Sequence, residues 1–140
     1  MSAVDTALAR ARAGLRRLTP EQAARAAAEG ALLVDTRYAA LRERDGEVPG
    51  AAIVERNELE WRLDPTSEYR LAGVEAERQV ILFCNEGYAS SFAAHALRSL
   101  GITTATDVIG GFQAWRHAGL PTTPPGTASA LTPHVQSHPR

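Results

Sequence analysis

The sequence predicts one α/β domain of three layers, in which a central, mostly parallel sheet has helices on both faces. Short apolar segments of strand length alternate with segments of helical pattern, an order typical of βαβ units. The clearest strand segments, 31–34 and 80–83, are continuously apolar, as expected for strands that helices cover on both sides. A chain of 140 residues is also the usual size of one domain that buries a core without metals or disulfides.

Residues 1–18 are predicted to form an N-terminal amphipathic helix. From position 5 to position 17, apolar residues recur at helical spacing, at Leu8, Ala11 and Leu15, and arginines lie between them. Such a helix packs its apolar face against the domain or against a partner.

The predicted domain extends over residues 19–121 and opens with a second helix. Thr19 is a favourable N-cap, Pro20 suits the first helical position, and Gln22 completes a capping box. Gly30 is a typical residue to follow the end of a helix, so this helix is predicted to end at residue 29.

The rest of the domain is predicted from apolar runs, helical periodicity and turn residues. Apolar runs predict strands over 31–35, 51–54 and 79–83, and a further strand is predicted over 106–109, before the glycine pair at 110–111. Helical patterns that end at turn residues predict helices over 38–44, 57–62, 88–100 and 112–118. After residue 121 the composition changes to Pro, Thr, Ser, Gly and His, so residues 122–140 are predicted to be a disordered tail.

The composition argues against several classes of function. The formal net charge is -1 and 22% of the residues are charged, so neither nucleic acid nor an anionic membrane is an expected partner. The single cysteine, Cys84, excludes an intramolecular disulfide and a multi-cysteine zinc site, and the four histidines lack metal-ligand spacing around it. No secretion signal is recognised, and the apolar runs are far shorter than the roughly 20 residues that cross a bilayer. A cytoplasmic protein without a metal site is therefore expected.

Cys84 is the candidate nucleophile. It follows the clearest buried strand, 79–83, and precedes a loop and the next helix. In parallel sheets ligands bind at the carboxyl ends of strands, and the free N–H groups of a loop that leads into a helix favour anions. Such a cradle stabilises the thiolate relative to a free thiol, whose pKa is about 8.5. The predicted active-site loop comprises Asn85, Glu86, Gly87, Tyr88, Ala89 and Ser90.

Four segments favour a nucleophile, although a lone cysteine at a strand end is more often a small buried apolar residue. They are 32–37 (LLVDTR), 48–51 (VPGA), 80–84 (VILFC) and 110–121 (GGFQAWRHAGLP). In this order and spacing they resemble the rhodanese family, and the resemblance extends over residues 19–121.

The resemblance implies a rhodanese-like three-layer fold and a single-domain sulfurtransferase without metal or organic cofactor. Cys84 takes sulfur from a small-molecule donor, thiosulfate or a thiol persulfide, carries it as Cys–S–S⁻, and passes it to a thiol, cyanide-like or protein acceptor. Asp35 and Arg37 are expected to brace the loops near the active site. Arg56 either binds an anionic substrate or is a solvated surface residue.

The loop departs from the commonest family pattern. Many active members carry Arg or Lys in the loop after the cysteine, whereas this loop has Glu86, Tyr88 and Ala89. A carboxylate disfavours a doubly charged donor, so a thiol persulfide or protein persulfide is expected in place of thiosulfate.

Two alternatives from other classes remain open. Cysteine-dependent phosphatases and arsenate reductases have related folds, but their longer loop ends in an arginine that this loop lacks. A non-catalytic rhodanese-like module would sense sulfur or dock a partner through the N-terminal helix and the tail. The presence of Cys84 and Gly87 argues against such an inactive site.

Overall fold

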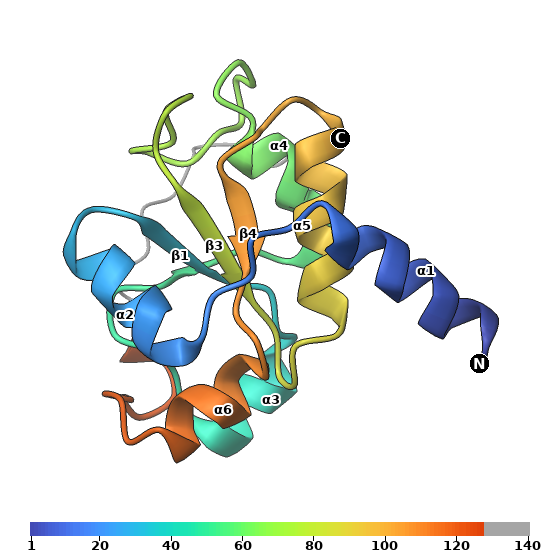
Figure 1. The fold of residues 1–140 in the computed structure, drawn as a ribbon. Coiled ribbons are helices and arrows are strands. Elements are labelled where there is room, and N and C mark those ends of the chain that lie inside the picture. The colour runs from blue at the N-terminus through green and yellow to red at the C-terminus, as the bar shows by residue number, and fades with distance from the viewer. Residues whose placement is uncertain (128–140) are drawn as a thin grey trace.

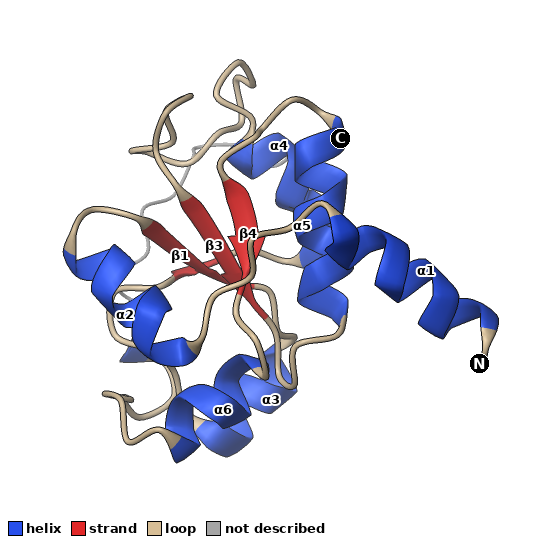
Figure 2. Ribbon diagram, in the orientation of Figure 1, coloured by secondary structure: helices blue, strands red, loops and turns tan. Residues whose placement is uncertain are grey.

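The computed structural model describes residues 1–127, and a four-stranded sheet lies at its centre. The strands are β1 (Leu32–Asp35), β2 (Ala52–Ile53), β3 (Val80–Phe83) and β4 (Ala105–Asp107). Their order is β2-β1-β3-β4, and every pairing between them is parallel. The predicted α/β domain with a mostly parallel sheet is therefore confirmed (Figure 2).

Helices cover both faces of this sheet. They are α1 (Ala3–Ala13), α2 (Pro20–Ala28), α3 (Ala39–Asp45), α4 (Leu59–Leu63), α5 (Ala89–Ser99) and α6 (Gly111–His117), with a 3-10 turn, η1 (Arg56–Glu58), before α4. In Figure 1, α2 lies on one side of the strands, and α4 and α5 lie on the other. The capping box predicted at the start of α2 is present, since Thr19 and Gln22 each accept a hydrogen bond from the other's backbone N–H.

Each face of the sheet has its own apolar core, which explains the continuous apolar runs in the sequence. Val34 and Leu82 pack with residues of α4 and α5, whereas Leu33 and Ile81 pack with residues of α2 and α6. All of these side chains are at most 5% exposed. Because successive residues of a strand face opposite sides, a strand that is covered on both faces needs apolar residues at consecutive positions.

The first helix ends earlier than predicted. α1 ends at Ala13 instead of residue 18, and a glycine, which has low helix propensity, follows it. The chain then pairs with the end of β4: the N–H of Leu18 donates to the Asp107 carbonyl at 3.0 Å, and the N–H of Ile109 donates to the Leu18 carbonyl at 2.8 Å. This pairing replaces the last predicted turn of helix. α1 itself extends away from the sheet and packs against α5 (Figure 1).

The start of α6 lies against the loop that follows β3. The N–H of Phe112 donates to the Cys84 carbonyl at 2.8 Å, and the N–H of Gln113 donates to the Asn85 carbonyl at 3.1 Å. A Cβ atom on Gly111, whose φ is 60°, would lie only 2.5 Å from the Cys84 carbonyl oxygen. The close approach and the positive φ therefore both require glycine at this position.

The C-terminal segment is described only in part. Residues 128–140, most of the predicted tail, lie outside the described residues. Thr123 precedes them and forms an antiparallel bridge with Glu47, through N–H to carbonyl hydrogen bonds of 2.8 and 2.9 Å. Across residues 1–127, no helix is both long enough and apolar enough to span a membrane.

Replacing Gly111 by alanine is expected to destabilise the protein more than the same change at Gly119. Gly111 begins α6 and Gly119 follows its end, and both have positive φ angles, of 60° and 74°, but a Cβ atom on Gly119 meets no atom within 4 Å. Gly119→Ala therefore carries only the backbone strain of about 1–2 kcal/mol, whereas Gly111→Ala adds a clash with the Cys84 carbonyl. Urea denaturation of the two variants measures the free energies of unfolding. Equal losses would contradict the close approach of α6 to the loop.

Candidate active site

Cys84 lies at the carboxyl end of β3, and backbone donors face its sulfur. The N–H groups of Gly87 and Ser90 donate to Sγ at 3.2 and 3.3 Å, and Cys84 is 7% exposed. Two backbone donors directed at one sulfur form a nest that favours an anion. Ser90 belongs to the first turn of α5, so the helix dipole acts in the same direction.

The conformation of the loop depends on Gly87. Its φ is 89°, and a Cβ atom on it would lie 2.6 Å from the backbone nitrogen of Gly110. The turn after β3 and the turn after β4 therefore touch each other. Since the carbonyls of Cys84 and Asn85 are held by α6, the N–H groups of the loop are left to face the sulfur.

A buried hydrogen-bond chain extends from the sulfur to Asp107. The Ser90 hydroxyl lies 3.3 Å from Sγ, where it accepts the thiol hydrogen, and it donates its own hydrogen to Asp107 Oδ2 at 2.8 Å. Ser91 donates to the same carboxylate oxygen at 2.8 Å. Asp107 is fully buried, and the guanidinium of Arg17 pairs with its carboxylate at 2.9 Å.

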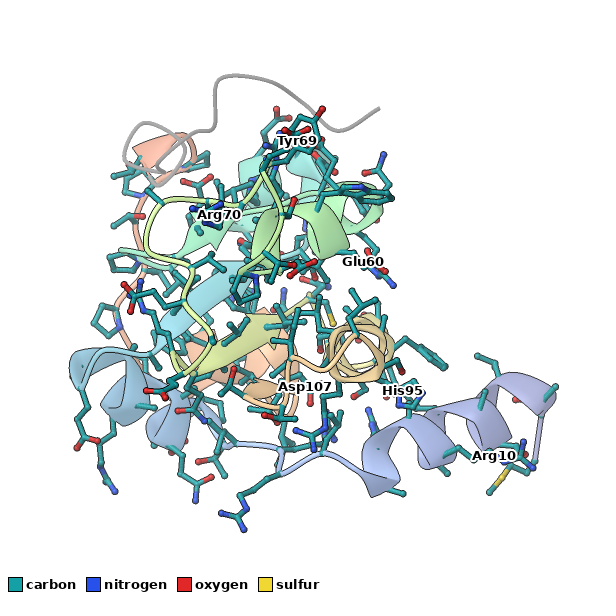
Figure 3. All side chains as sticks on the ribbon, turned by 90° about the horizontal axis from the view of Figure 1, so that it is seen from above. Arg10, Glu60, Tyr69, Arg70, His95 and Asp107 are labelled. Carbon is teal, nitrogen blue, oxygen red and sulfur yellow. The ribbon has the colours of Figure 1, made fainter. Side chains whose placement is uncertain are left out.

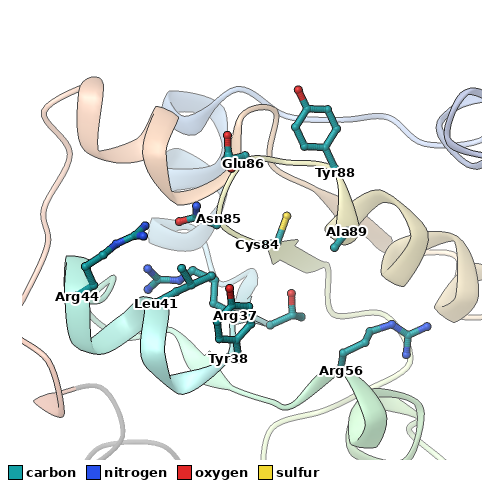
Figure 4. Close-up of a pocket in the computed structure, with 11 residues that line it drawn as sticks. Arg37, Tyr38, Leu41, Arg44, Arg56, Cys84, Asn85, Glu86, Tyr88 and Ala89 are labelled. Carbon is teal, nitrogen blue, oxygen red and sulfur yellow. The ribbon is translucent and has the colours of Figure 1, made fainter. Parts of the chain in front are cut away.

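A pocket of about 430 Å³ opens beside Cys84 (Figure 4). It is lined by Thr36, Arg37, Tyr38, Leu41, Arg44, Arg56, Cys84, Asn85, Glu86, Tyr88 and Ala89. The pocket thus brings Arg37 and Arg56 together with Cys84 and most of the predicted loop. Gly87 and Ser90 do not line it, because they are buried and face the sulfur through their N–H groups.

Asp35 and Arg37 form a buried ion pair next to the pocket. The guanidinium donates to both carboxylate oxygens at 2.8–3.2 Å, and the two side chains are 1% and 0% exposed. Arg37 also donates to the Gly46 carbonyl at 2.8 Å and stacks on the Phe112 ring, 4.0 Å from its centroid. The pair therefore connects the end of β1 with the turn after α3 and with α6.

The two other arginines of the pocket are each paired with a carboxylate. Arg44 donates to both oxygens of Asp45, at 2.9 and 2.7 Å, and these hydrogen bonds lower the pKa of Asp45 to about 2. Arg56 donates to Glu60 at 2.9 Å and is 45% exposed, so it both lines the pocket and meets solvent. The pocket therefore holds paired cations together with the exposed carboxylate of Glu86.

Four residues that form hydrogen bonds with residues of this loop are not among those predicted from the sequence. They are Arg12, Arg17, Asp107 and Gln113. Asp107 is the last residue of β4, as Asp35 is of β1. A carboxylate at the end of a strand is therefore a sequence feature that could have identified Asp107. Gln113 donates to the side chain of Asn85 at 2.9 Å. Arg12 and Arg17 precede Gly87 by 75 and 70 positions, and no local pattern connects them to the loop.

Comparisons with known proteins show the family to which this chain belongs. The model of the rhodanese-like domain family matches residues 19–118. A solved structure from Rhodopseudomonas palustris, a protein of unknown function described as a possible tyrosine phosphatase, is 29% identical with a TM-score of 0.78, covering 88% of this chain and 96% of that chain. Comparison with curated protein sequences gives no match.

Two sulfurtransferases of known structure are also similar. A thiosulfate sulfurtransferase from Pseudomonas aeruginosa is 26% identical with a TM-score of 0.63, covering 89% of this chain and 22% of that one. The homodimeric polysulfide-sulfur transferase of Wolinella succinogenes is 24% identical with a TM-score of 0.71, covering 87% and 88% of the two chains, and it shows the shared fold. Because the family model spans well over half of its residues, the chain belongs to the rhodanese-like domain family.

Proposed function

We propose that the protein is a sulfurtransferase in which Cys84 carries sulfur as a persulfide. The hydrogen bonds to the sulfur of Cys84 support this most directly. At the end of a buried strand, Sγ accepts hydrogen bonds from the N–H groups of Gly87 and Ser90 at 3.2 and 3.3 Å. Such donors stabilise a thiolate before the reaction and a persulfide anion after it, without a metal ion.

The reaction consists of two displacements. The Cys84 thiolate attacks the outer sulfur of a donor R–S–S⁻, a new S–S bond forms, and the old S–S bond breaks with its electron pair on the leaving RS⁻. An acceptor nucleophile then attacks the outer sulfur of Cys84–S–S⁻, which returns the Cys84 thiolate. In each step one bond to the transferred sulfur forms while another breaks, and ping-pong kinetics follow.

The charges around the pocket favour a thiol persulfide as donor over thiosulfate. Asp45 raises the pKa of Arg44, and the carboxylate of Glu86, which lines the same pocket, makes a smaller contribution in the same direction. Arg44 and Arg56 are already paired with carboxylates, Asp45 and Glu60, so neither offers a free guanidinium to a dianion. Tyr38 and Tyr88 line the same pocket and are 63% and 60% exposed, which suits the organic part of a thiol persulfide.

Phosphoryl transfer is a weaker candidate, although one similar structure is described as a possible tyrosine phosphatase. Catalysis of phosphoryl transfer depends on cations that stabilise the charge of the transferred group. Positions 89–91 of this loop are Ala89, Ser90 and Ser91, without an arginine. A non-catalytic module that senses sulfur or docks a partner is the second alternative. The mass of carried sulfur and an assay of aryl phosphate hydrolysis together separate all three functions.

Incubation with glutathione persulfide is expected to increase the intact mass of the wild-type protein by about one sulfur atom. Cyanide then removes this sulfur as thiocyanate, because it attacks the outer sulfur of the persulfide. The Cys84→Ser variant is expected to gain no mass. Intact-protein mass spectrometry before and after cyanide makes the measurement.

Two other results would contradict the proposal. If neither glutathione persulfide nor thiosulfate adds sulfur to the folded protein, the non-catalytic module becomes the better interpretation. If the protein hydrolyses an aryl phosphate and Cys84→Ser abolishes this activity while no sulfur is carried, the phosphatase interpretation is favoured.

Replacing Glu86 by glutamine is expected to raise kcat/KM for thiosulfate about two- to fivefold. Removing a partly solvated like charge contributes about 0.4–1 kcal/mol to binding of the dianion and its transition state. The increase is smaller for glutathione persulfide, whose carboxylates lie further from the transferred sulfur. Glu77→Gln is the matched control, because Glu77 is exposed and precedes β3, at the opposite edge of the sheet. Equal effects of the two substitutions in steady-state kinetics would argue against a role for Glu86.

A further inference from the structure

Two arginines from the segment before the family match hold the back of the active-site loop. The Gly87 carbonyl accepts hydrogen bonds from Arg12 Nη2 at 2.7 Å and from Arg17 Nη2 at 3.0 Å. We propose that Arg12 and Arg17 are positioning residues for Cys84, which keep the loop N–H groups on the sulfur and supply the positive charge that the loop itself lacks. The inference rests on the proposed role of Cys84 as a nucleophile.

Arg12 connects the loop to the helix that follows it. Its Nη2 donates to the Gly87 carbonyl at 2.7 Å, and its Nε donates to the Ser91 hydroxyl at 3.0 Å. The same guanidinium lies over the Tyr88 ring, 5.7 Å from its centroid. Arg12 thus contacts Gly87, Tyr88 and Ser91, which span the junction between the loop and α5.

Arg17 connects the loop to the buried carboxylate behind it. Its Nε and Nη2 donate to the two oxygens of Asp107 at 2.9 and 3.2 Å, and its Nη2 also reaches the Gly87 carbonyl. Asp107 in turn accepts the hydroxyl hydrogens of Ser90 and Ser91. Without Arg17, an uncompensated buried carboxylate would lie behind the sulfur and oppose the thiolate.

These contacts restrain the most flexible residue of the loop. Gly87 has a φ of 89°, and glycine can adopt many backbone conformations besides this one. Guanidinium hydrogen bonds to its carbonyl orient the peptide group that follows Gly87. The N–H of Ser90 lies three residues further on, so the same contacts hold the path of the chain between the two donors to Sγ.

The charge on this side of the loop complements the charge in the pocket. In the pocket, Arg37, Arg44 and Arg56 are each paired with a carboxylate, and Glu86 adds a negative charge that offsets the second arginine, Arg116, on Asp45. Behind the loop, two guanidiniums face one carboxylate, so the balance is one positive charge. Among residues 1–127, no carboxylate is paired with Arg12. The charged or titratable groups that line the pocket beside Cys84 or contact its loop from behind are Arg12, Arg17, Arg37, Tyr38, Arg44, Arg56, Glu86, Tyr88 and Asp107.

The test is the pH dependence of Cys84 alkylation by iodoacetamide, an uncharged reagent, in the full-length protein. In Arg12→Gln, the midpoint of the pH profile is expected to rise by about one pH unit, because a nearby positive charge that favours the thiolate is lost. Arg10→Gln is the matched control: it removes the same charge from the same helix, and Arg10 is exposed (Figure 3). Its midpoint is expected to equal that of the wild type. Thermal unfolding verifies that both variants are folded.

Arg12→Lys separates charge from geometry. Lysine keeps the positive charge but lacks the planar fork that reaches Gly87 and Ser91 together, so its midpoint is expected between those of the wild type and Arg12→Gln. Equal midpoints for the wild type, Arg12→Gln and Arg10→Gln would overturn the inference, and so would a midpoint for Arg12→Lys outside the expected interval.

The outcome is independent of whether the protein transfers sulfur, because alkylation requires only the thiol. A shifted midpoint in Arg12→Gln without any persulfide adduct in the mass experiment would refute the proposed function and leave the positioning role intact. An unshifted midpoint together with a persulfide adduct would refute the positioning role and leave the proposed function intact.

Discussion

The hydrogen bonds that the start of α6 donates to the carbonyls of Cys84 and Asn85 are the contacts on which the candidate site depends. In a short loop after a strand, either the backbone N–H groups or the carbonyls can face the side chain at the start of the loop. Here the carbonyls of the first two loop residues are bound by Phe112 and Gln113, and the N–H groups of Gly87 and Ser90 are directed at the sulfur. Gly111 allows this contact, because any side chain there would collide with the Cys84 carbonyl.

The charged side chains near the sulfur form two groups, which differ in net charge. On the pocket side, the arginines are paired with carboxylates, and the buried pair of Asp35 and Arg37 also orders the ends of β1 and α3. Behind the loop, Arg17 compensates the buried carboxylate of Asp107, and Arg12 adds a further positive charge. A pocket with little net positive charge and a loop supported by positive charge from behind can stabilise a sulfur anion without attracting every small dianion.

The fold could be predicted from the sequence because its determinants are local. Consecutive apolar residues such as Leu33 and Val34 serve the two cores on opposite faces of the sheet, and their continuity indicates a parallel sheet covered on both sides. The end of α1 was not predictable in the same way. The arginine-rich stretch before residue 19 retains a helical pattern, but the backbone of Leu18 pairs with the chain at the end of β4, about ninety positions away.

For the candidate site, the sequence by itself determined that a lone cysteine follows a buried strand and precedes a glycine and a helix. These facts place Cys84 at the carboxyl edge of the sheet, since strand, turn and helix are all specified within a dozen residues. Only the tertiary structure decided which distant side chains support this loop. Arg12 and Arg17 meet at the carbonyl of Gly87, and Asp107 accepts the hydroxyl hydrogen of Ser90. These contacts form because α1 packs on α5, the chain at Leu18 pairs with the end of β4, and β4 lies beside β3. Such contacts depend on the relative placement of whole elements, and no periodicity or spacing within the chain encodes them locally.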